Sequence, residues 1–471
     1  MKLDRSTLTQ LPVAVPTYDR SEIGIGIVHF GVGGFHRAHQ AMYIDQLLER
    51  GLAQDWGICG VGVMPADLRM RDALDAQDGL YTLILKNPDG TRDVRVIGSI
   101  LEYRYAPDDP EAVIELLAAP TTRIVSLTIT EGGYQIENAG DLSVFGLVTE
   151  ALSRRRARGI ASPTIVSCDN IEGNGDIARQ AFTGYAEKVH PGLSDWMAEH
   201  TKFPNSMVDR ITPVTTADVI SGLADEFDID DQWPVVAEPF TAWVLEDDFA
   251  NGRPPLDEVG VLMVEDVTPY ELMKLRLLNA SHQGLCYFAY LSGYRLVHEA
   301  AGDPLFAEFL LAYMDSEATP TLKPVPGIDL SDYKHTLIER FANPGVRDTI
   351  ARLCADSSDR IPKWLLPVIR ANLDTGEPIR LSAAIVASWA RYAEAVDEHG
   401  EPIEVVDQLA DSLIPIAQSQ REKPLAFIEN EALFGDLAQQ SRFVEAYRWT
   451  LDTLHRDGAR TTLEQLLKDR R

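Results

Sequence analysis

The sequence predicts an α/β fold, with a Rossmann-type N-terminal domain followed by a mainly α-helical C-terminal domain. Apolar β-branched runs alternate with helical patterns up to about residue 267, and a glycine-rich turn joins the first run to a helix. Long helical patterns fill the remainder. A length of 471 residues is too great for one ordinary core. We therefore divide the chain into an α/β domain at 1–267 and a mainly helical domain at 268–471.

In the first domain, strands are expected where apolar β-branched residues run together, as in buried parallel sheets. These runs are 23–30, 56–63, 123–130 and 164–168. The helical patterns between or beside them are 38–49, 70–76, 110–118 and 148–159. Strands that alternate with helices in this way indicate a doubly wound sheet.

The second domain is expected to contain helices at 270–291, 304–314, 331–340 and 383–395. Segment 320–327 (PTLKPVPG) is short and flanked by helices, so we interpret it as an ordered connection. The helix at 270 has a well-marked start: Thr268 as the cap, Pro269 at the first helical position and Glu271 placed for a capping box.

Polar residues on this helix share one side of it. At 100° per residue, Glu271, Lys274, Asn279 and His282 project into one arc of roughly 140°. Leucines occupy the same arc, and a lysine among apolar neighbours is costly unless it is paired or deprotonated. Lys274 is therefore a candidate catalytic base. The alternative is a surface lysine on a helix of different register, and His282 alone is typical of a satisfied core histidine.

Segment 31–36 (GVGGFH) follows an expected strand and precedes an expected helix. Glycines at such a turn let backbone N–H groups approach a pyrophosphate closely. The third glycine of the GxGxxG pattern is replaced by His36, so an ordinary turn is an equal alternative. Asp67, after the second expected strand, suits an adenosine ribose, and a loop or capping role suits it equally well.

Other polar groups point less clearly to chemistry. His36 and His39 have HxxH spacing, but no acidic partner follows at a recognised distance, so no metal site is expected. We interpret Cys168 as a buried small residue. Asn170 follows the strand expected at 164–168, where an amide can donate to a developing oxyanion.

Composition excludes several classes of partner. Against 43 basic residues stand 72 acidic ones, and the net charge of −29 opposes nucleic acid and anionic membranes. A dinucleotide needs only a local site. The four cysteines form no CxxC pair, and we find neither a leader nor an apolar run of membrane-spanning length. We therefore expect a cytoplasmic protein.

These residues resemble the long-chain polyol dehydrogenases over nearly the whole chain. The segment at 203–213 (FPNSMVDRITP) matches the family signature, and its occurrence together with the lysine helix makes the resemblance specific. The other segments that carry the resemblance are 31–40, 126–134, 167–170, 233–240, 243–247, 274–282 and 324–330.

The resemblance implies NAD-linked, metal-independent oxidation of a sugar alcohol to a ketose, D-mannitol to D-fructose being the expected pair, and the reverse reduction. At the matching positions, Lys274 resembles the general base, and Asn170 and Asn279 resemble the pair that holds the alkoxide-like oxygen. Desolvation lowers the pKa of a lysine and nearby carboxylates raise it, so burial tunes such a base. Two amides stabilise developing negative charge without adding a formal charge.

The resemblance also implies roles for further side chains. His282 and Asp209 resemble substrate-hydroxyl contacts, and Arg352 resembles the basic residue near the polyol. Glu131 and Glu271 resemble carboxylates near the proton path, although a capping role alone also explains Glu271. The cofactor-binding residues that we expect are Gly31, Gly33, Gly34, Phe35 and Asp67.

Two positions depart from the family. Relatives can carry an acidic residue where this chain has Ala66, so a carboxylate that would repel a 2′-phosphate is missing. Asp67 still favours NAD over NADP. Arg360 occupies a basic position near the substrate that can be lysine in relatives.

Other activities stay open. A hexuronate reductase, acting on fructuronate or tagaturonate, would use Arg352 with Arg360 to neutralise the substrate carboxylate. Sorbitol or arabinitol would replace mannitol within the polyols. An inactive dinucleotide-binding sensor would have lost the lysine, asparagine and histidine set, all of which is present. The partner we expect is a small polyol or ketose, with no nucleic acid or membrane, and the resemblance favours a monomer.

Overall fold

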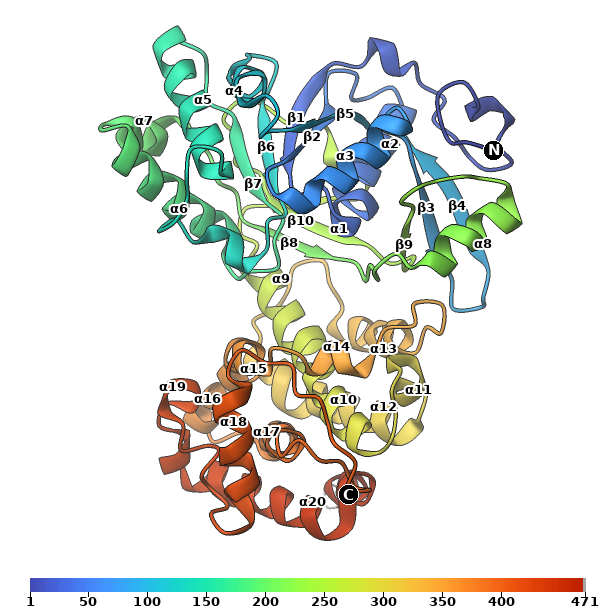
Figure 1. Ribbon diagram of the computed structural model, residues 1–471. Helices are drawn as coiled ribbons and strands as arrows, with labels where there is room; N and C mark the ends of the chain where they lie inside the picture. The colour runs from blue at the N-terminus through green and yellow to red at the C-terminus, as the bar shows by residue number, and fades with distance from the viewer. Residues whose placement is uncertain (469–471) are drawn as a thin grey trace. The chain divides into compact units, whose positions relative to one another are not determined.

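The computed structural model describes residues 1–468, and of Glu131 it describes the backbone alone. The chain forms two compact units, Met1–Thr268 and Pro269–Arg471 (Figure 1). The first unit combines a parallel sheet with helices and the second is mainly helical. The fold class predicted from the sequence is confirmed. No helix among residues 1–468 is both long and apolar enough to cross a membrane.

A parallel five-stranded sheet lies at the centre of the first unit, in the order β5-β2-β1-β6-β7. Its strands are β1 (Ile25–Phe30), β2 (Gly57–Gly62), β5 (Ile100–Tyr105), β6 (Ile124–Leu127) and β7 (Thr164–Ser167). The strand order reverses between β1 and β6. Ligands of open α/β sheets bind at such a switch point, beyond the carboxyl ends of the strands. The segments that follow β1 and β6 are thus where a cofactor is expected.

Helices cover both faces of this sheet. Side chains along each strand alternate between the two faces, so each strand contributes to two cores. Ile27 and Ile58 belong to the core beneath α2 and α3, whereas Val28 and Val61 belong to the core beneath α4, α5, α6 and α7. The helices of this unit are α1 (Gly34–Ala38), α2 (Gln40–Glu49), α3 (Leu68–Ala76), α4 (Pro110–Ala118), α5 (Val144–Arg158), α6 (Asn174–Val189), α7 (Leu193–His200) and α8 (Ala217–Phe227).

Two three-stranded sheets complete the first unit, in the orders β4-β3-β9 and β11-β10-β8. Their strands are β3 (Tyr81–Lys86), β4 (Arg92–Ile97), β8 (Ser206–Asp209), β9 (Val235–Ala237), β10 (Ala242–Glu246) and β11 (Leu262–Val264). Neither sheet is predicted from the sequence, because most of these strands are short or carry charged residues. The expected helix 148–159 begins earlier, at Val144, where the Ser143 hydroxyl accepts the Gly146 N–H.

The second unit is built around α17, whose residues from Leu381 to Tyr392 are all buried. α10 and α20 pack against it. The helices of this unit are α9 (Thr268–Met273), α10 (Ala280–Leu291), α11 (Val297–Ala301), α12 (Pro304–Tyr313), α13 (Leu330–Phe341), α14 (Ile350–Cys354), α15 (Ser357–Trp364), α16 (Leu366–Thr375), α17 (Arg380–Tyr392), α18 (Ala410–Gln418), α19 (Glu431–Phe434) and α20 (Ser441–Lys468). Two π-helical turns, Lys274–Asn279 and Met314–Ala318, interrupt this pattern.

Candidate active site

The turn after β1, which we call the glycine turn (residues 31–34), requires glycine at its first position. Gly31 has φ of +89°, and a Cβ there would lie 2.0 Å from the carbonyl oxygen of Thr128. Gly33 is different, since a Cβ there would meet only the Gly31 oxygen, at 3.8 Å. The first glycine therefore allows β1 and β6 to approach, and the second leaves open space beside the backbone that a cofactor pyrophosphate can occupy.

A relay of hydrogen bonds holds the Gly31 carbonyl. The Thr128 hydroxyl donates to this carbonyl at 2.7 Å and contacts His29 Nε2 at 3.0 Å, while His29 Nδ1 lies 2.8 Å from the Ser126 hydroxyl. Because the Thr128 hydroxyl donates its only proton to the Gly31 carbonyl, it accepts from His29 Nε2. His29 Nδ1 then carries no proton and accepts from the Ser126 hydroxyl. Burial lowers the pKa of His29 to about 3, so the ring is neutral.

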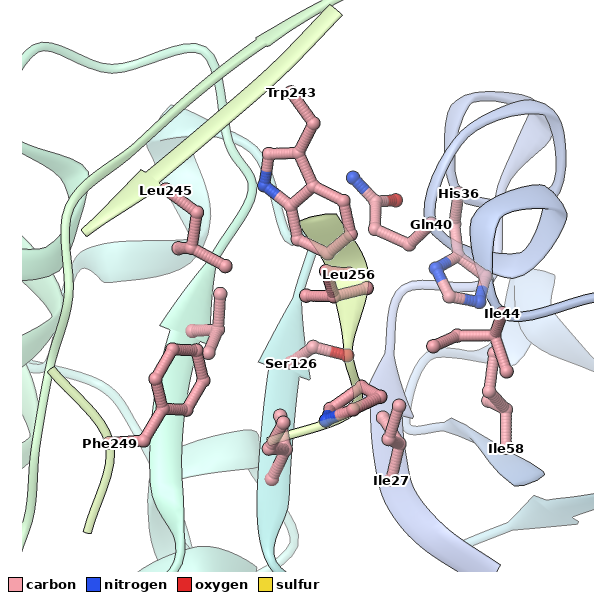
Figure 2. Close-up of a pocket in the computed structure, with 13 residues that line it drawn as sticks. Ile27, His36, Gln40, Ile44, Ile58, Ser126, Trp243, Leu245, Phe249 and Leu256 are labelled. Atoms are coloured by element: carbon pink, nitrogen blue, oxygen red, sulfur yellow. The ribbon is translucent and has the colours of Figure 1, made fainter. Parts of the chain in front are cut away.

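His36 stands where the common dinucleotide pattern has its third glycine. Its ring stacks on that of His29, with centroids 3.4 Å apart and planes 13° apart. Burial lowers the pKa of His36 well below its ordinary value, so two neutral rings stack without charge repulsion. His36, Gln40 and Trp243 line a cavity of about 20 Å³ (Figure 2). Such a cavity has room for one water molecule and excludes a nucleotide.

Asp67 fixes the loop that follows β2. Its Oδ2 accepts the N–H groups of Val63 and Met64, at 2.9 and 2.8 Å. Asp67 therefore has the loop role that was one of its two alternatives from the sequence. Both bonds use one carboxylate oxygen, so a ribose role for Asp67 rests on Oδ1.

Asp169 ties the end of β7 to the segment after β6. Its carboxylate accepts the Ile129 N–H at 3.1 Å, the Thr130 N–H at 2.7 Å and the Tyr134 hydroxyl at 2.7 Å. Thr130 has φ of 64° and ψ of 169°, a strained conformation for a residue with a side chain. Asn170, the expected oxyanion donor, is the exposed residue that follows. Sequence reasoning missed Asp169, although a carboxylate at a strand end is itself a signal.

Asp209 is buried at the end of β8, opposite Ala242. The neighbouring Arg210, which sequence reasoning missed, donates to the carbonyls of Glu238 at 2.9 and 3.0 Å and of Ala38 at 2.6 Å. Burial lowers the pKa of Arg210 to about 10, so it remains charged at neutral pH. Arg210 thereby joins the signature segment to the end of α1.

Glu131 and His39 are two further residues that the sequence singled out. Glu131 begins a 3₁₀ turn (Glu131–Tyr134), but its side chain lies outside the part of the chain that the structure describes. Its place on the proton path stays a prediction. His39 contacts the Ala242 carbonyl at 2.9 Å through Nε2. Within residues 1–468, no group of three or more His, Cys, Asp or Glu side chains is placed to hold a metal ion.

The helix expected at 270–291 is present, as an unbroken helical stretch from Thr268 to Leu291, but its middle is π-helical, which the sequence did not predict. Between α9 and α10 lies the π-turn Lys274–Asn279, in which the Ala280 N–H donates to the Leu275 carbonyl, five residues back. Leucines surround this stretch, so the apolar pattern does not reveal the extra residue. One extra residue in the turn reduces the angle between Lys274 and Asn279 from about 140° to about 40°. The two polar side chains therefore leave the helix on nearly the same side.

The polar residues of this helix are buried. Lys274 is 8% exposed, Asn279 6%, His282 9% and Glu271 7%, so the alternative of a surface lysine is wrong. Asn279 Oδ1 has no hydrogen-bond partner among the described residues. Buried amides normally have partners, so this atom marks a place for a polar ligand. The His282 ring lies 4.3 Å from that of Phe341.

The start of the helix also differs from the prediction. α9 includes Thr268, whose N–H donates to the Asp266 carboxylate at 2.9 Å. The Asp266 side chain therefore fixes the turn that leads into α9.

Both arginines expected at the substrate have protein partners. Arg352 forms a two-point ion pair with Asp348, with its Nε 2.6 Å from Oδ1, and this hydrogen-bonded pair raises the pKa of Arg352. Arg360 donates to the carbonyls of Arg352 and Leu353 at 3.0 and 3.2 Å. Arg360 thus supports the backbone of α14.

Comparison with known proteins matches both halves of the chain to family models. The Rossmann domain of mannitol dehydrogenases matches residues 25–258, and the C-terminal domain of mannitol dehydrogenases matches residues 266–455. The mannitol 2-dehydrogenase of Phaeosphaeria nodorum is 45% identical, over 99% of this chain and 85% of the relative. That of Neosartorya fischeri is 42% identical, over 99% of each.

Solved structures give the same picture. The Pseudomonas fluorescens mannitol 2-dehydrogenase, in ternary complex with NAD and D-mannitol, is similar with a TM-score of 0.89 and 44% identity, over 99% of this chain and all of that one. A substrate-free D-sorbitol dehydrogenase is similar with a TM-score of 0.91 and 37% identity, over 98% of this chain and all of that one.

Proposed function

The chain belongs to the mannitol dehydrogenase family, and we propose that it oxidises D-mannitol at C2 to D-fructose, with NAD as hydride acceptor, and catalyses the reverse reduction. The observation that carries this proposal is the similarity over the whole chain to an enzyme solved with NAD and D-mannitol. The buried Lys274 and Asn279 on one side of the π-turn supply the groups that such a reaction needs.

The first unit fits NAD. The open space at Gly33, with Gly34 and Phe35 beyond it, suits the pyrophosphate, and Asp67 Oδ1 suits the hydroxyls of the adenosine ribose. When bound, NAD accepts the hydride from C2 of the substrate. With alanine at position 66, Asp67 is the carboxylate on which the preference for NAD over NADP depends.

The proton and the developing charge are handled by side chains. Lys274 takes the proton of the C2 hydroxyl as general base. Asn279 donates to the same oxygen, and Asn170 is the second donor that the family resemblance implies. The π-turn supports this assignment, because it brings Lys274 and Asn279 to within about 40° of each other around the helix.

The remaining roles concern recognition and proton movement. His282 and Asp209 hold substrate hydroxyls, and Arg352 lies near the polyol. Glu131 and Glu271 serve the proton path. We assign Arg360 to support of α14, since it donates to two carbonyls there.

D-sorbitol is the second candidate substrate, because a D-sorbitol dehydrogenase is also similar over nearly the whole chain. A hexuronate is less well supported. Its carboxylate would need a cation, whereas Arg352 is paired with Asp348 and Arg360 is bound to backbone carbonyls.

Steady-state kinetics test the proposal. We expect NAD-dependent oxidation of mannitol to exceed that of sorbitol and arabinitol in kcat/KM, and NADH-dependent reduction of fructose to exceed that of fructuronate. Strong turnover of fructuronate with negligible turnover of fructose would contradict the substrate assignment. We also propose a cytoplasmic monomer, for which light scattering after size-exclusion chromatography should give the mass of one chain, 52.2 kDa.

A further inference from the structure

The π-turn Lys274–Asn279 changes the carbonyl to which one backbone N–H donates. In an α-helix the Ala280 N–H would donate to the Arg276 carbonyl, but here it donates to the Leu275 carbonyl. The Arg276 oxygen is thereby released from that bond. A second group that binds the Arg276 oxygen therefore favours the π-helical register over the α-helical one.

The Tyr313 hydroxyl binds the Arg276 carbonyl oxygen. The distance is 3.2 Å, and Tyr313 is the last residue of α12, far from Arg276 in the sequence. Tyr313 is fully buried, and burial raises its pKa well above the ordinary value. The phenol therefore keeps its proton at neutral pH and acts as a donor.

Arg276 is held at a second point by the same stretch of chain. Its Nη1 donates to the Thr321 carbonyl at 2.7 Å. Tyr313 and Thr321 flank the second π-turn, Met314–Ala318, so residues 313–321 clasp Arg276 by both its carbonyl and its guanidinium. We call this pair of contacts the Arg276 clasp.

The clasp determines the direction of the two polar side chains. If the Arg276 oxygen returned to the Ala280 N–H, the helix would lose its extra residue there, and Asn279 would rotate by about 100° relative to Lys274. A base and an oxyanion donor that serve one oxygen cannot tolerate such a rotation, because small misplacements of reacting groups slow catalysis strongly.

We propose that Tyr313 is a positioning residue that holds the π-turn in register and so keeps Lys274 and Asn279 aimed at one substrate oxygen. This inference rests on the proposed function. Tyr313 itself acts through Arg276 and handles no proton of the reaction.

The test compares Tyr313→Phe with Tyr447→Phe. Tyr447 is a matched control, since it is also fully buried in the second unit and its hydroxyl donates to Gln420 Oε1 at 2.6 Å. We expect Tyr313→Phe to lower kcat for mannitol oxidation about 10- to 100-fold. The dissociation constant of NADH, measured by fluorescence titration, should stay within about twofold, because the cofactor turn is untouched. Tyr447→Phe should leave both quantities unchanged.

A crystal structure of Tyr313→Phe gives the direct readout. We expect the Ala280 N–H to donate to Arg276 in this variant. Wild-type kcat in Tyr313→Phe, or an equal loss in Tyr447→Phe, would overturn the proposal. If Tyr313→Phe does not fold, Arg276→Met removes the guanidinium contact with Thr321 and should also lower kcat, by a smaller factor, without loss of NADH binding.

The failure of the inference is distinguishable from that of the proposed function. Wild-type protein without mannitol oxidation by NAD would refute the function. Active wild-type protein with an equally active Tyr313→Phe variant would refute only the role of Tyr313.

Discussion

The glycine turn and the π-turn Lys274–Asn279 are both irregular stretches of backbone, and in each a hydroxyl from a distant element binds a carbonyl. Thr128 donates to Gly31 in the first, and Tyr313 donates to Arg276 in the second. They differ in what the local sequence reveals. The glycine turn needs glycine at position 31, whereas the π-turn consists of ordinary helix-forming residues. Irregular backbone is therefore visible in a sequence only where it depends on the residue's own conformation.

The largest expected effect separates chemistry from cofactor binding. Lys274→Ala should lower kcat for mannitol oxidation by about 10³-fold or more, because the variant lacks the proposed general base. The NADH dissociation constant should change by less than about twofold. Lys363→Ala, which removes an exposed lysine paired with Asp359, is the control and should behave as wild type. Turnover near the wild-type value in Lys274→Ala would contradict the assignment of Lys274 as the general base.

The next effect concerns the glycine turn. Gly31→Ala should weaken NADH binding about 100-fold or prevent folding, since its Cβ would overlap the Thr128 oxygen. Gly90→Ala is a close control, because Gly90 has φ of +87° and a Cβ there would meet nothing within 4 Å. It should cost about 1–2 kcal/mol of stability and leave NADH binding unchanged. Fluorescence titration and thermal unfolding measure both quantities, and equal behaviour of the two variants would show that the close approach is unimportant.

A smaller effect tests the relay behind the glycine turn. Thr128→Val keeps the shape of the side chain but leaves the Gly31 carbonyl and His29 Nε2 without their partner. We expect the NADH dissociation constant to rise about 10-fold, with kcat at saturating NAD nearly unchanged. Thr128→Ser restores a hydroxyl and should restore binding. A fall in kcat at constant NADH affinity would mean that Thr128 acts on the chemistry instead.

The smallest effect is on stability at mildly acidic pH. Burial lowers the pKa of His29 from 6.5 to about 3, and that of His36 falls in the same direction. Below pH 6.5 these histidines bind protons in the unfolded chain but stay neutral in the folded chain. The free energy of unfolding therefore falls as the pH falls. The free energy of unfolding should drop by about 1 kcal/mol per histidine between pH 6.5 and 5.5. Urea titrations at these two pH values measure it, and His29→Gln should show about half the drop.

The sequence predicts the parts of the fold in which each element carries its own signal. The buried strands β1, β2, β6 and β7 were found from β-branched runs, whereas β5 was missed because Glu102 and Arg104 interrupt its apolar pattern at the sheet edge. Lys274 and Asn279 were found from their position on an apolar helix. Their relative direction was not, since it depends on Tyr313 and on an extra residue that 3.6-residue periodicity cannot register.

The same reasoning explains the missed supporting residues. Asp169 and Arg210 bond to segments far away in the chain, and only the fold brings these partners together. The roles of Arg352 and Arg360 were carried over from a resemblance. Asp348 and the carbonyls of α14 now give both side chains a partner within the protein.

The stacked pair of His29 and His36 has a consequence for protein engineering. A designer who follows residue frequencies among dinucleotide-binding proteins would replace His36 with glycine. That substitution would remove a ring packed at 3.4 Å and enlarge a cavity already present beneath it, at a cost of several kcal/mol. Residue frequencies average over many ways of filling the same space, and in this chain the ring of His36 fills it.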